Sequence, residues 1–305
     1  MPALEILSFC AGVNHMNYQE LYNYGATRLT LAHIEEAALD ARLLLEAVCR
    51  TKKHDLLING EIEVPSTQEQ DYINHITKRE THIPLQYILG EQEFMGLKFI
   101  VTPDTLIPRQ DTETLVEEVK RHLHDGFTIL DMCTGTGCIL LSLLYYSNNC
   151  LGTGVDISAA ALDVAKKNEK QINSLPRTTP PLNPITWIQS DLFIEINNRY
   201  DIIVSNPPYI PTAILNTLMP EVKDHEPLIA LDGKEDGLHF YRKIIDQSSQ
   251  HLNPGGKLFL EIGYDQATAI TTLMQTSGYH DITVIKDLTG KNRVIYGRRI
   301  PCSTA

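Results

Sequence analysis

Four consecutive residues, Asn206-Pro207-Pro208-Tyr209, combine groups that suit the binding of a planar NH2 group. They follow the apolar run Tyr200–Val204, which is typical of a buried parallel strand. Proline has no N–H and biases the residue before it away from the helical region, so backbone carbonyls remain available as acceptors. The Asn206 side chain accepts and donates hydrogen bonds, and Tyr209 adds a flat face. The tetrapeptide therefore predicts a pocket for a side-chain amide or for the exocyclic amine of a base.

A glycine turn earlier in the chain predicts a cofactor site. The run Ile129–Gly137 (ILDMCTGTG) is a strand that enters a turn of small residues and opens a helix. Such a turn lets a ligand approach the backbone closely, and the helix N-terminus offers free N–H groups. Asp156 ends the next strand, where a carboxylate can accept both hydroxyls of a ribose. The candidate cofactor-binding residues of the turn are Asp131, Cys133, Thr134, Gly135, Thr136 and Gly137.

Two kinds of cofactor compete for this turn. A dinucleotide fingerprint requires G-x-G-x-x-G, whereas this chain has G-T-G-C-I-L from Gly135. The missing third glycine and the acidic Asp131 before the turn favour S-adenosylmethionine, because its ammonium group seeks an acid and its sulfonium carries no phosphate. The product would then be S-adenosylhomocysteine. Asp191 is a candidate acceptor for the adenine amine, with Leu192 or Phe193 against the ring, and the alternative for Asp191 is a turn cap.

The order of expected elements around these motifs defines an α/β fold. Helices are expected from Gly137, Ser158, Leu238 and Asp265, alternating with strands. This alternation predicts a doubly wound, mostly parallel sheet of the Rossmann-like type, with two closing strands that form an antiparallel edge. The expected strands are Thr128–Met132, Gly152–Asp156, Ile185–Gln189, Tyr200–Val204, Lys257–Ile262, Ile282–Lys286 and Arg293–Arg298, and Asn173–Pro184 is expected to be a surface loop.

The segment before this fold is expected to be a separate helical domain. Apolar residues between Asn17 and Leu89 recur at helical spacing, and Ser66 with Glu69 has the pattern of a capping box that opens a helix over 67–80. Phe94–Val101 has the two-residue period of a hairpin around a glycine. The expected domains are therefore 1–90, helical; 91–105, a hairpin linker; and 106–300, the α/β domain. Residues 1–15 are expected to be disordered or to precede a natural start at Met16.

Composition limits the classes of function. The chain of 305 residues carries 26 Lys and Arg against 38 Asp and Glu, a formal charge of −12, which argues against stable binding of nucleic acid. The six cysteines show no metal-ligand spacing, and His122 and His124 are expected at the surface near a helix end. No apolar run approaches the roughly 18 residues of a membrane span, and no targeting peptide is evident. We therefore expect a cytoplasmic protein that uses neither a metal nor a membrane.

Taken together, these residues resemble the protein-(glutamine-N5) methyltransferases of the HemK type, in particular the branch that acts on peptide chain release factors. The similarity runs from about Tyr18 to Arg298 and consists of many short motifs in one order. Besides the glycine turn and the tetrapeptide, the motifs are Pro84–Gly90 (PLQYILG), Phe94 with Gly96, Leu106–Arg109 (LIPR), Asp111–Glu113 (DTE), Val155–Ser158 (VDIS), Glu226-Pro227, Ala230-Leu231, Asp236–Leu238 (DGL), Pro254–Gly256 (PGG) and Glu261–Gly263 (EIG).

The resemblance implies a class I S-adenosylmethionine-dependent catalytic domain and a helical domain that helps dock a class 1 release factor. The implied substrate is the glutamine of a Gly-Gly-Gln loop, methylated on its side-chain nitrogen N5. By similarity, Cys133–Gly137, Asp156, Leu192 and Asn206 would contact the cofactor, and Asn206–Tyr209 would hold the glutamine amide.

Two positions depart from the family pattern. The family usually has glycine where Cys133 stands, so the cofactor carboxylate is expected to sit slightly differently here. Gln110 replaces a usual proline. We interpret Glu113 as part of the acidic first turn of a helix, and Arg109 as the partner of a carboxylate or of the bound protein.

The chemistry expected from these residues is positioning. An amide nitrogen is a poor nucleophile because its lone pair is delocalised, whereas a sulfonium methyl is already electrophilic, so neither a covalent intermediate nor a metal is needed. Asn206 and the Pro207 carbonyl are expected to accept the two amide hydrogens while Tyr209 stacks on the amide plane. Alignment of this kind can lower a barrier by roughly 7–11 kcal/mol.

Three other functions stay open at this point. The same tetrapeptide can hold a flipped base, as in a DNA adenine-N6 methyltransferase, although the charge of −12 argues against it. A ribosomal-protein glutamine methyltransferase is a second alternative, but Leu106–Glu113 is more similar to the release-factor branch. The third is a non-catalytic cofactor-binding adaptor that uses the helical bundle as its interface.

Overall fold

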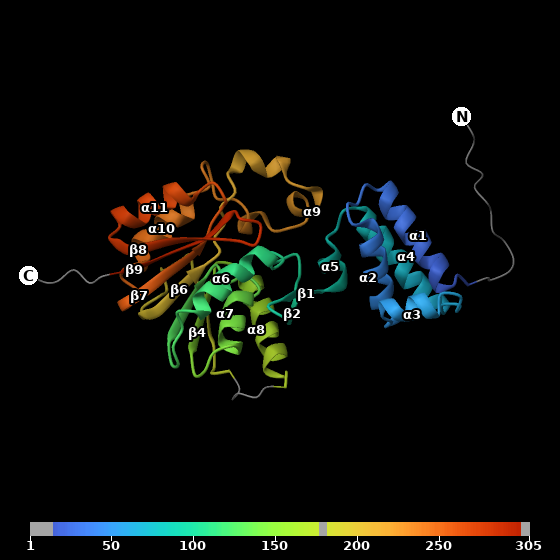
Figure 1. The fold of residues 1–305 in the computed structure, drawn as a ribbon, viewed down its shortest axis with the longest axis horizontal. Helices are drawn as coiled ribbons and strands as arrows, with labels where there is room; N and C mark the ends of the chain where they lie inside the picture. Colours follow the sequence, from blue (N-terminus) through green and yellow to red (C-terminus); the bar gives the residue numbers. More distant parts are fainter. Residues whose placement is uncertain (1–14, 177–181, 300–305) are drawn as a thin grey trace, which may run out of the picture. The chain divides into compact units, whose positions relative to one another are not determined.

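The computed structural model describes residues 15–176 and 182–299, which form two compact units that divide between Leu89 and Gly90 (Figure 1). Each unit has an apolar core of its own. Two expectations lie at least partly outside the described residues: the character of the N-terminus before His15, and the middle of the Asn173–Pro184 loop. No helix within 15–176 and 182–299 is long and apolar enough to cross a membrane.

The first unit consists of helices, as the apolar spacing predicts. Its core is made by apolar faces of the longer helices, among them Leu44 and Leu45 on one helix and Tyr72 and Ile76 on another, all fully buried. The helices are α1 (Tyr18–Leu31), α2 (Ala37–Cys49), α3 (Lys53–Ile58), α4 (Ser66–Glu80) and α5 (Leu85–Leu89).

The capping box predicted at Ser66 is wrong. Helix α4 begins at Ser66 itself, and Pro65 stands at the N-cap with an extended ψ of 138° and no side-chain hydrogen bond. A capping side chain must come from a residue that is still outside the helix, and Ser66 is already inside it. A capping box does open α1, where Asn17 and Glu20 exchange side chain to backbone bonds of 2.9 Å.

The second unit begins with the predicted hairpin and continues into the predicted sheet, so the expected fold class is confirmed. The hairpin is β1 (Glu91–Phe94) and β2 (Leu97–Ile100). The sheet has the order β5-β4-β3-β6-β7-β9-β8, in which only β9 runs against its neighbours. Its strands are β3 (Thr128–Met132), β4 (Leu151–Asp156), β5 (Thr186–Gln189), β6 (Tyr200–Ser205), β7 (Leu252–Glu261), β8 (Tyr279–Lys286) and β9 (Asn292–Arg299).

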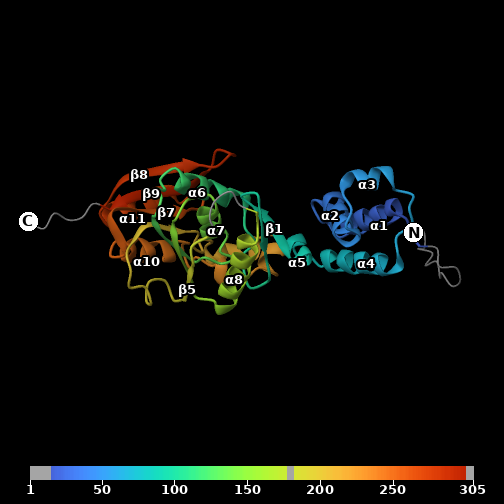
Figure 2. The ribbon, with the colours of Figure 1, turned by 90° about the horizontal axis from the view of Figure 1, so that it is seen from below.

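Alternating side chains of the central strands fill two separate cores. In β6, Ile202 and Val204 enter the core with α6 (Gln110–Lys120) and α7 (Cys138–Tyr145), whereas Ile203 enters the core with α10 (His239–Ser248) and α11 (Ala267–Thr276). The ribbon views show these helix pairs on opposite faces of the sheet (Figures 1 and 2). Both faces are covered, which explains why the strands read as apolar runs.

The hairpin is tied to the glycine turn through α8 (Ala159–Asn173). Asn168, fully buried on α8, accepts from the Ile100 N–H at 2.6 Å and donates from Nδ2 to the carbonyls of Ile100 and Thr136 at 3.0 Å. A single amide side chain therefore fixes the end of β2 against the turn that precedes α7.

Two stretches differ from the expected elements. Strand β7 starts at Leu252 rather than Lys257, because Leu252 pairs with Tyr200 before a register shift accommodates Pro254 and the glycines after it. Between β6 and α10 the chain forms short helices that the sequence pattern does not predict, namely η1 (Thr212–Thr217), α9 (Pro220–Lys223) and η2 (Leu228–Ala230).

Candidate active site

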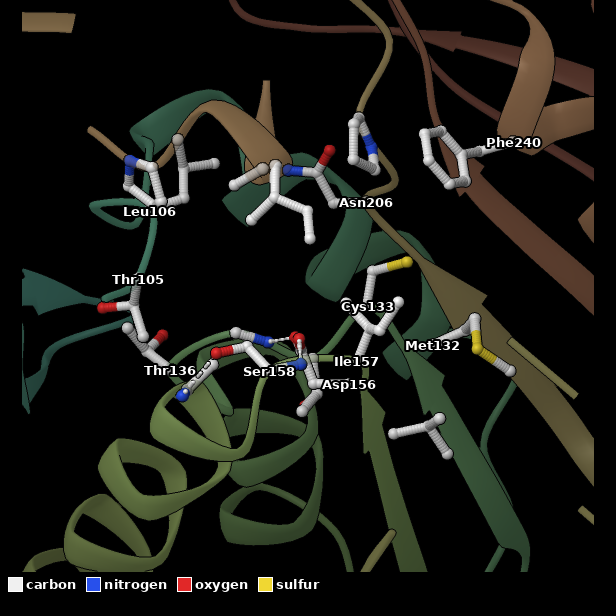
Figure 3. A pocket seen from close by; sticks show the side chains of 18 of the residues that line it. Thr105, Leu106, Met132, Cys133, Thr136, Asp156, Ile157, Ser158, Asn206 and Phe240 are labelled. Carbon is white, nitrogen blue, oxygen red and sulfur yellow. Dashed lines mark hydrogen bonds between the residues drawn. The ribbon is translucent and has the colours of Figure 1, made fainter. Parts of the chain in front are cut away.

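A cavity of about 340 Å³ lies at the carboxyl ends of the parallel strands β3, β4 and β6. This edge of an open α/β sheet is where ligands bind. Asn206 and Asp156 face each other across it, with Cys133 on the wall between them (Figure 3). The predicted site residues that line the cavity are Cys133, Thr134, Gly135, Thr136, Asp156, Asp191, Leu192, Asn206 and Pro208.

The turn after β3 adopts left-handed backbone at three positions. Cys133, Gly135 and Gly137 have φ of 62°, 54° and 78°. Gly137 is also closely packed, because a Cβ atom there would lie 3.0 Å from the Trp187 ring. The glycine that the family usually carries at position 133 would meet the same backbone requirement. In this chain Cys133 meets it at a steric cost, and burial raises the pKa of its thiol.

Asp156 is held by two backbone donors. Its Oδ2 accepts from the Gly135 N–H and its Oδ1 from the Ser158 N–H, both at 2.9 Å. Each carboxylate oxygen can accept more than one hydrogen bond, so the group retains capacity toward the cavity. Burial raises the pKa of Asp156 above its ordinary value, and these backbone bonds oppose that rise.

Asp131 lies behind the turn and is absent from the described cavity lining. Its side chain is fully buried, and its Oδ2 accepts from the Thr134 hydroxyl at 2.6 Å. Its Oδ1 has no partner among the described residues. Burial raises the pKa of Asp131 to about 7. The contact predicted between Asp131 and a cofactor stays a prediction.

The segment after β5 presents Asp191 and Leu192 to the cavity. Leu192 has a φ of 52°, and the Ser190 hydroxyl donates to its carbonyl at 2.9 Å. Phe193, the alternative to Leu192 as an apolar wall, instead stacks on His251 with ring centroids 4.9 Å apart. Of the two, only Leu192 lines the cavity within the described chain.

The tetrapeptide is only partly exposed to the cavity. Asn206 and Pro208 line it, and Asn206 Nδ2 donates to the Thr112 hydroxyl at 3.4 Å. Tyr209 lies outside the described lining, with its hydroxyl 3.4 Å from Glu261 Oε1 and its carbonyl accepting from Gln266 at 3.0 Å. Pro207 is buried and also lies outside that lining. The roles predicted for Pro207 and Tyr209 stay predictions.

Arg109 pairs with a carboxylate, one of the two partners that its sequence context allows. Its Nη2 lies 2.6 and 2.7 Å from the two oxygens of Glu226, whose side chain is almost fully buried. Burial raises the pKa of Glu226, and Arg109 opposes the rise. The pair joins the N-cap of α6 to the loop before η2. Glu113 does lie in the acidic first turn of α6, where it also accepts from the Met95 N–H at 2.6 Å.

Several lining residues carried no separate signal in the sequence. Thr112 was visible only as the middle of the Asp111–Glu113 motif. Others come from segments distant along the chain, and these include Thr105, Ile229, His239, Phe240 and Lys243. His122 was expected at the surface, but it is half-buried and packs against Phe259 and Tyr296.

Comparison with known proteins decides the family. The PrmC N-terminal domain model matches residues 20–90, and the Methyltransferase small domain model matches residues 109–218. The chain is 38% identical over 266 residues to the release factor glutamine methyltransferase of Geobacter sulfurreducens, covering 87% of this chain and 90% of that protein. The chain belongs to the release factor glutamine methyltransferase family.

A second relative gives the same result. The release factor glutamine methyltransferase of Clostridium botulinum is 38% identical over 289 residues, which is 93% of this chain and all of that protein. A solved structure of a release factor-specific protein-(glutamine-N5) methyltransferase from Alicyclobacillus acidocaldarius is 30% identical and covers 67% of this chain and 100% of that one, with a TM-score of 0.39.

Proposed function

We propose that the protein methylates the side-chain amide nitrogen N5 of the glutamine in the Gly-Gly-Gln motif of class 1 peptide chain release factors, in the cytoplasm, with S-adenosylmethionine as methyl donor. The observation that carries the proposal is the placement of Asn206 and Asp156 on opposite sides of one cavity. Asn206, the proposed amide-binding residue, and Asp156, the proposed ribose-binding residue, therefore line the same cavity.

The residues present fit the proposed donor. Asp156 offers carboxylate oxygens that are already oriented by the backbone of Gly135 and Ser158. Leu192 and Ile157 supply apolar wall, and Asp191 lies beside them as an acceptor for an exocyclic amine. The donor, when bound, supplies an electrophilic methyl group on a sulfonium. Gly135 has left-handed backbone and no side chain, so its main chain borders the cavity directly. A ligand can therefore approach this backbone closely.

The protein side of the reaction is alignment of the amide. We assign Asn206 Oδ1 and the Pro207 carbonyl as acceptors for the two amide hydrogens, and the Tyr209 ring as the surface beneath the amide plane. Holding both hydrogens leaves the nitrogen directed at the cavity, and exclusion of water strengthens these bonds. The methylated nitrogen loses one proton, for which solvent is the acceptor.

A methyl-transfer assay tests the proposal. Purified protein is incubated with S-adenosylmethionine labelled in its methyl group and with a purified release factor, either wild type or with alanine in place of the Gly-Gly-Gln glutamine. We expect about one labelled methyl on the wild-type factor and none on the variant. Equal labelling of both factors, or labelling of duplex DNA alone, would contradict the proposal.

A further inference from the structure

The backbone of Tyr209, the last residue of the tetrapeptide, is held by a side chain from a distant segment. Gln266 stands at the N-cap of α11, and its Nε2 donates to the Tyr209 carbonyl at 3.0 Å. The same nitrogen lies 3.4 Å from the Gly237 carbonyl, and Gln266 Oε1 accepts from the Gly263 N–H at 3.0 Å. Because carbonyls only accept and a backbone N–H only donates, these partners fix which end of the amide is the NH2 group.

The tetrapeptide depends on such contacts because it has little backbone hydrogen bonding of its own. Pro207 and Pro208 carry no N–H and cannot donate. The start of the tetrapeptide is positioned by β6, whose last residue, Ser205, is paired with both β3 and β7. Tyr209 lies beyond the end of β6, so its position must come from contacts outside the sheet.

The segment before α10 supplies a second contact with the same backbone. The Ile210 N–H donates to the Leu231 carbonyl at 3.0 Å, and the Gly233 N–H donates to the Ile210 carbonyl at 2.8 Å, which forms a short parallel bridge. Gly233 is buried, and a Cβ atom there would lie 2.7 Å from both the Cα and the carbonyl carbon of Tyr209. The Tyr209 backbone therefore touches both Gln266 and a bare glycine.

We propose that Gln266 is a positioning residue for methyl transfer, which holds Tyr209 and the prolines before it in the conformation that receives the substrate amide. This inference rests on the proposed function, since it concerns the same amide pocket. Gln266 lies outside the described lining of the cavity, so it acts through Tyr209. Loss of its NH2 group removes the donor to the Tyr209 carbonyl and lets the ring beneath the amide plane move. The cofactor-binding residues follow β3, β4 and β5, so cofactor binding should not depend on this bond.

Substitution of Gln266 tests the proposal by kinetics. Gln266→Met keeps the length of the side chain and removes its amide. With saturating S-adenosylmethionine and release factor, we expect the single-turnover rate to fall roughly 10- to 100-fold, since displaced reactants lose the benefit of orientation. The dissociation constant of S-adenosylmethionine, measured by calorimetry, should not change.

Asn253→Leu is the matched control for this substitution. Asn253 is also a half-buried amide, and its Nδ2 donates to Asp201 at 2.7 Å at the amino ends of β6 and β7, away from the cavity. The control should lose stability in urea unfolding without losing rate. A wild-type rate in Gln266→Met, a weakened cofactor affinity, or an equal fall in rate in Asn253→Leu would overturn the proposal.

Substitution of Gly233 displaces the same backbone through its other contact. Gly233 does not have left-handed backbone, so the cost of Gly233→Ala comes from the close approach to its neighbours. We expect the single-turnover rate to fall roughly 10-fold or more, again through lost orientation. Gly152→Ala, near the start of β4, meets leucine side chains instead of backbone and should keep the rate. A wild-type rate in Gly233→Ala would show that the position of the Tyr209 backbone does not matter.

Hydrogen exchange separates this inference from the proposed function, because it requires no turnover. The Ile210 and Gly233 N–H groups, both bonded in the bridge, report whether residues 209–212 and 231–237 stay together. Mass spectrometry should show faster exchange in both segments of Gln266→Met and wild-type exchange there in Asn253→Leu. Unchanged exchange in Gln266→Met would contradict the positioning role, whereas faster exchange together with no methyl transfer by the wild type would contradict only the function.

Discussion

Two residues close to the cavity combine full burial with ionisable side chains. Burial raises the pKa values of Asp131 and Glu261 to about 7, whereas exposed Asp and Glu titrate near 4. Because the folded-state pKa exceeds the unfolded-state pKa, each group contributes stability that is present below about pH 4 and is lost as the pH rises through about 7. Selection for stability alone would not keep these carboxyl groups inside the fold.

Substitution of Asp131 by asparagine should remove one of these pH-dependent contributions to the free energy of unfolding. We expect Asp131→Asn to be more stable than the wild type at pH 8, by on the order of 2 kcal/mol, and equally stable at pH 4. Urea unfolding at both pH values measures the difference. Asp201→Asn is the opposite control: burial alone raises the pKa of Asp201, but hydrogen bonds from Thr128 and Asn253 lower it overall. Loss of Asp201 should therefore destabilise the protein at neutral pH. A wild-type-like pH profile in Asp131→Asn would contradict the argument.

The left-handed backbone at Cys133 gives a second prediction at this scale. A β-branched residue at φ 62° is strained, so Cys133→Val should lower the free energy of unfolding by about 1–2 kcal/mol and weaken binding of S-adenosylmethionine. Cys133→Gly should keep the turn and the binding. Calorimetric titration compares the affinities of the two variants for S-adenosylmethionine. Equal affinities would show that the backbone conformation at position 133 does not affect binding.

At the scale of elements, the pair of Arg109 and Glu226 joins the start of α6 to a loop that lines the cavity. Arg109→Ala leaves Glu226 buried without its cation. Because the Arg109 side chain is 40% exposed, we expect a loss of only about 1–2 kcal/mol of stability, below the cost of breaking a fully buried pair. The Michaelis constant for the release factor should rise with it, since η2, which begins two residues after Glu226, carries the lining residue Ile229. Gln110→Ala, on the adjacent helix residue, is the matched control and should change neither quantity.

The elements that the sequence predicts best are those with strong periodicity. The strand Thr128–Met132 and the left-handed glycines after it follow from local pattern, and the cavity lies where that strand ends. The first residue of a helix is predicted less well. Ser66 is a residue type that is common at the N-cap, but Pro65 occupies the N-cap and Ser66 is already inside the helix. The cavity wall from Ile229 to Lys243 could not be predicted, since only tertiary packing brings it to the glycine turn. Glu261 belongs to a motif of the sequence, but its place beside Asn206 depends on strand register.

At the scale of the whole molecule, the cavity residues all lie within the second unit. We propose that the helical unit contributes to release-factor docking and not to cofactor binding. A chain that begins at Gly90 should then bind S-adenosylmethionine with unchanged affinity, while its kcat/KM for the release factor falls on the order of 10²-fold through loss of a second contact. Calorimetry and the methyl-transfer assay measure the two quantities. Unchanged kcat/KM in the shortened chain would contradict the docking role.

The most direct test of the account is the single-turnover rate of Asn206→Ala with saturating S-adenosylmethionine and release factor. If Asn206 aligns the glutamine amide, this rate should fall on the order of 10²-fold or more, because misplaced reactants lose the benefit of orientation. Asn206→Asp should also be slow, since it lacks the NH2 group that donates to Thr112. A rate close to that of the wild type in Asn206→Ala would contradict the central claim.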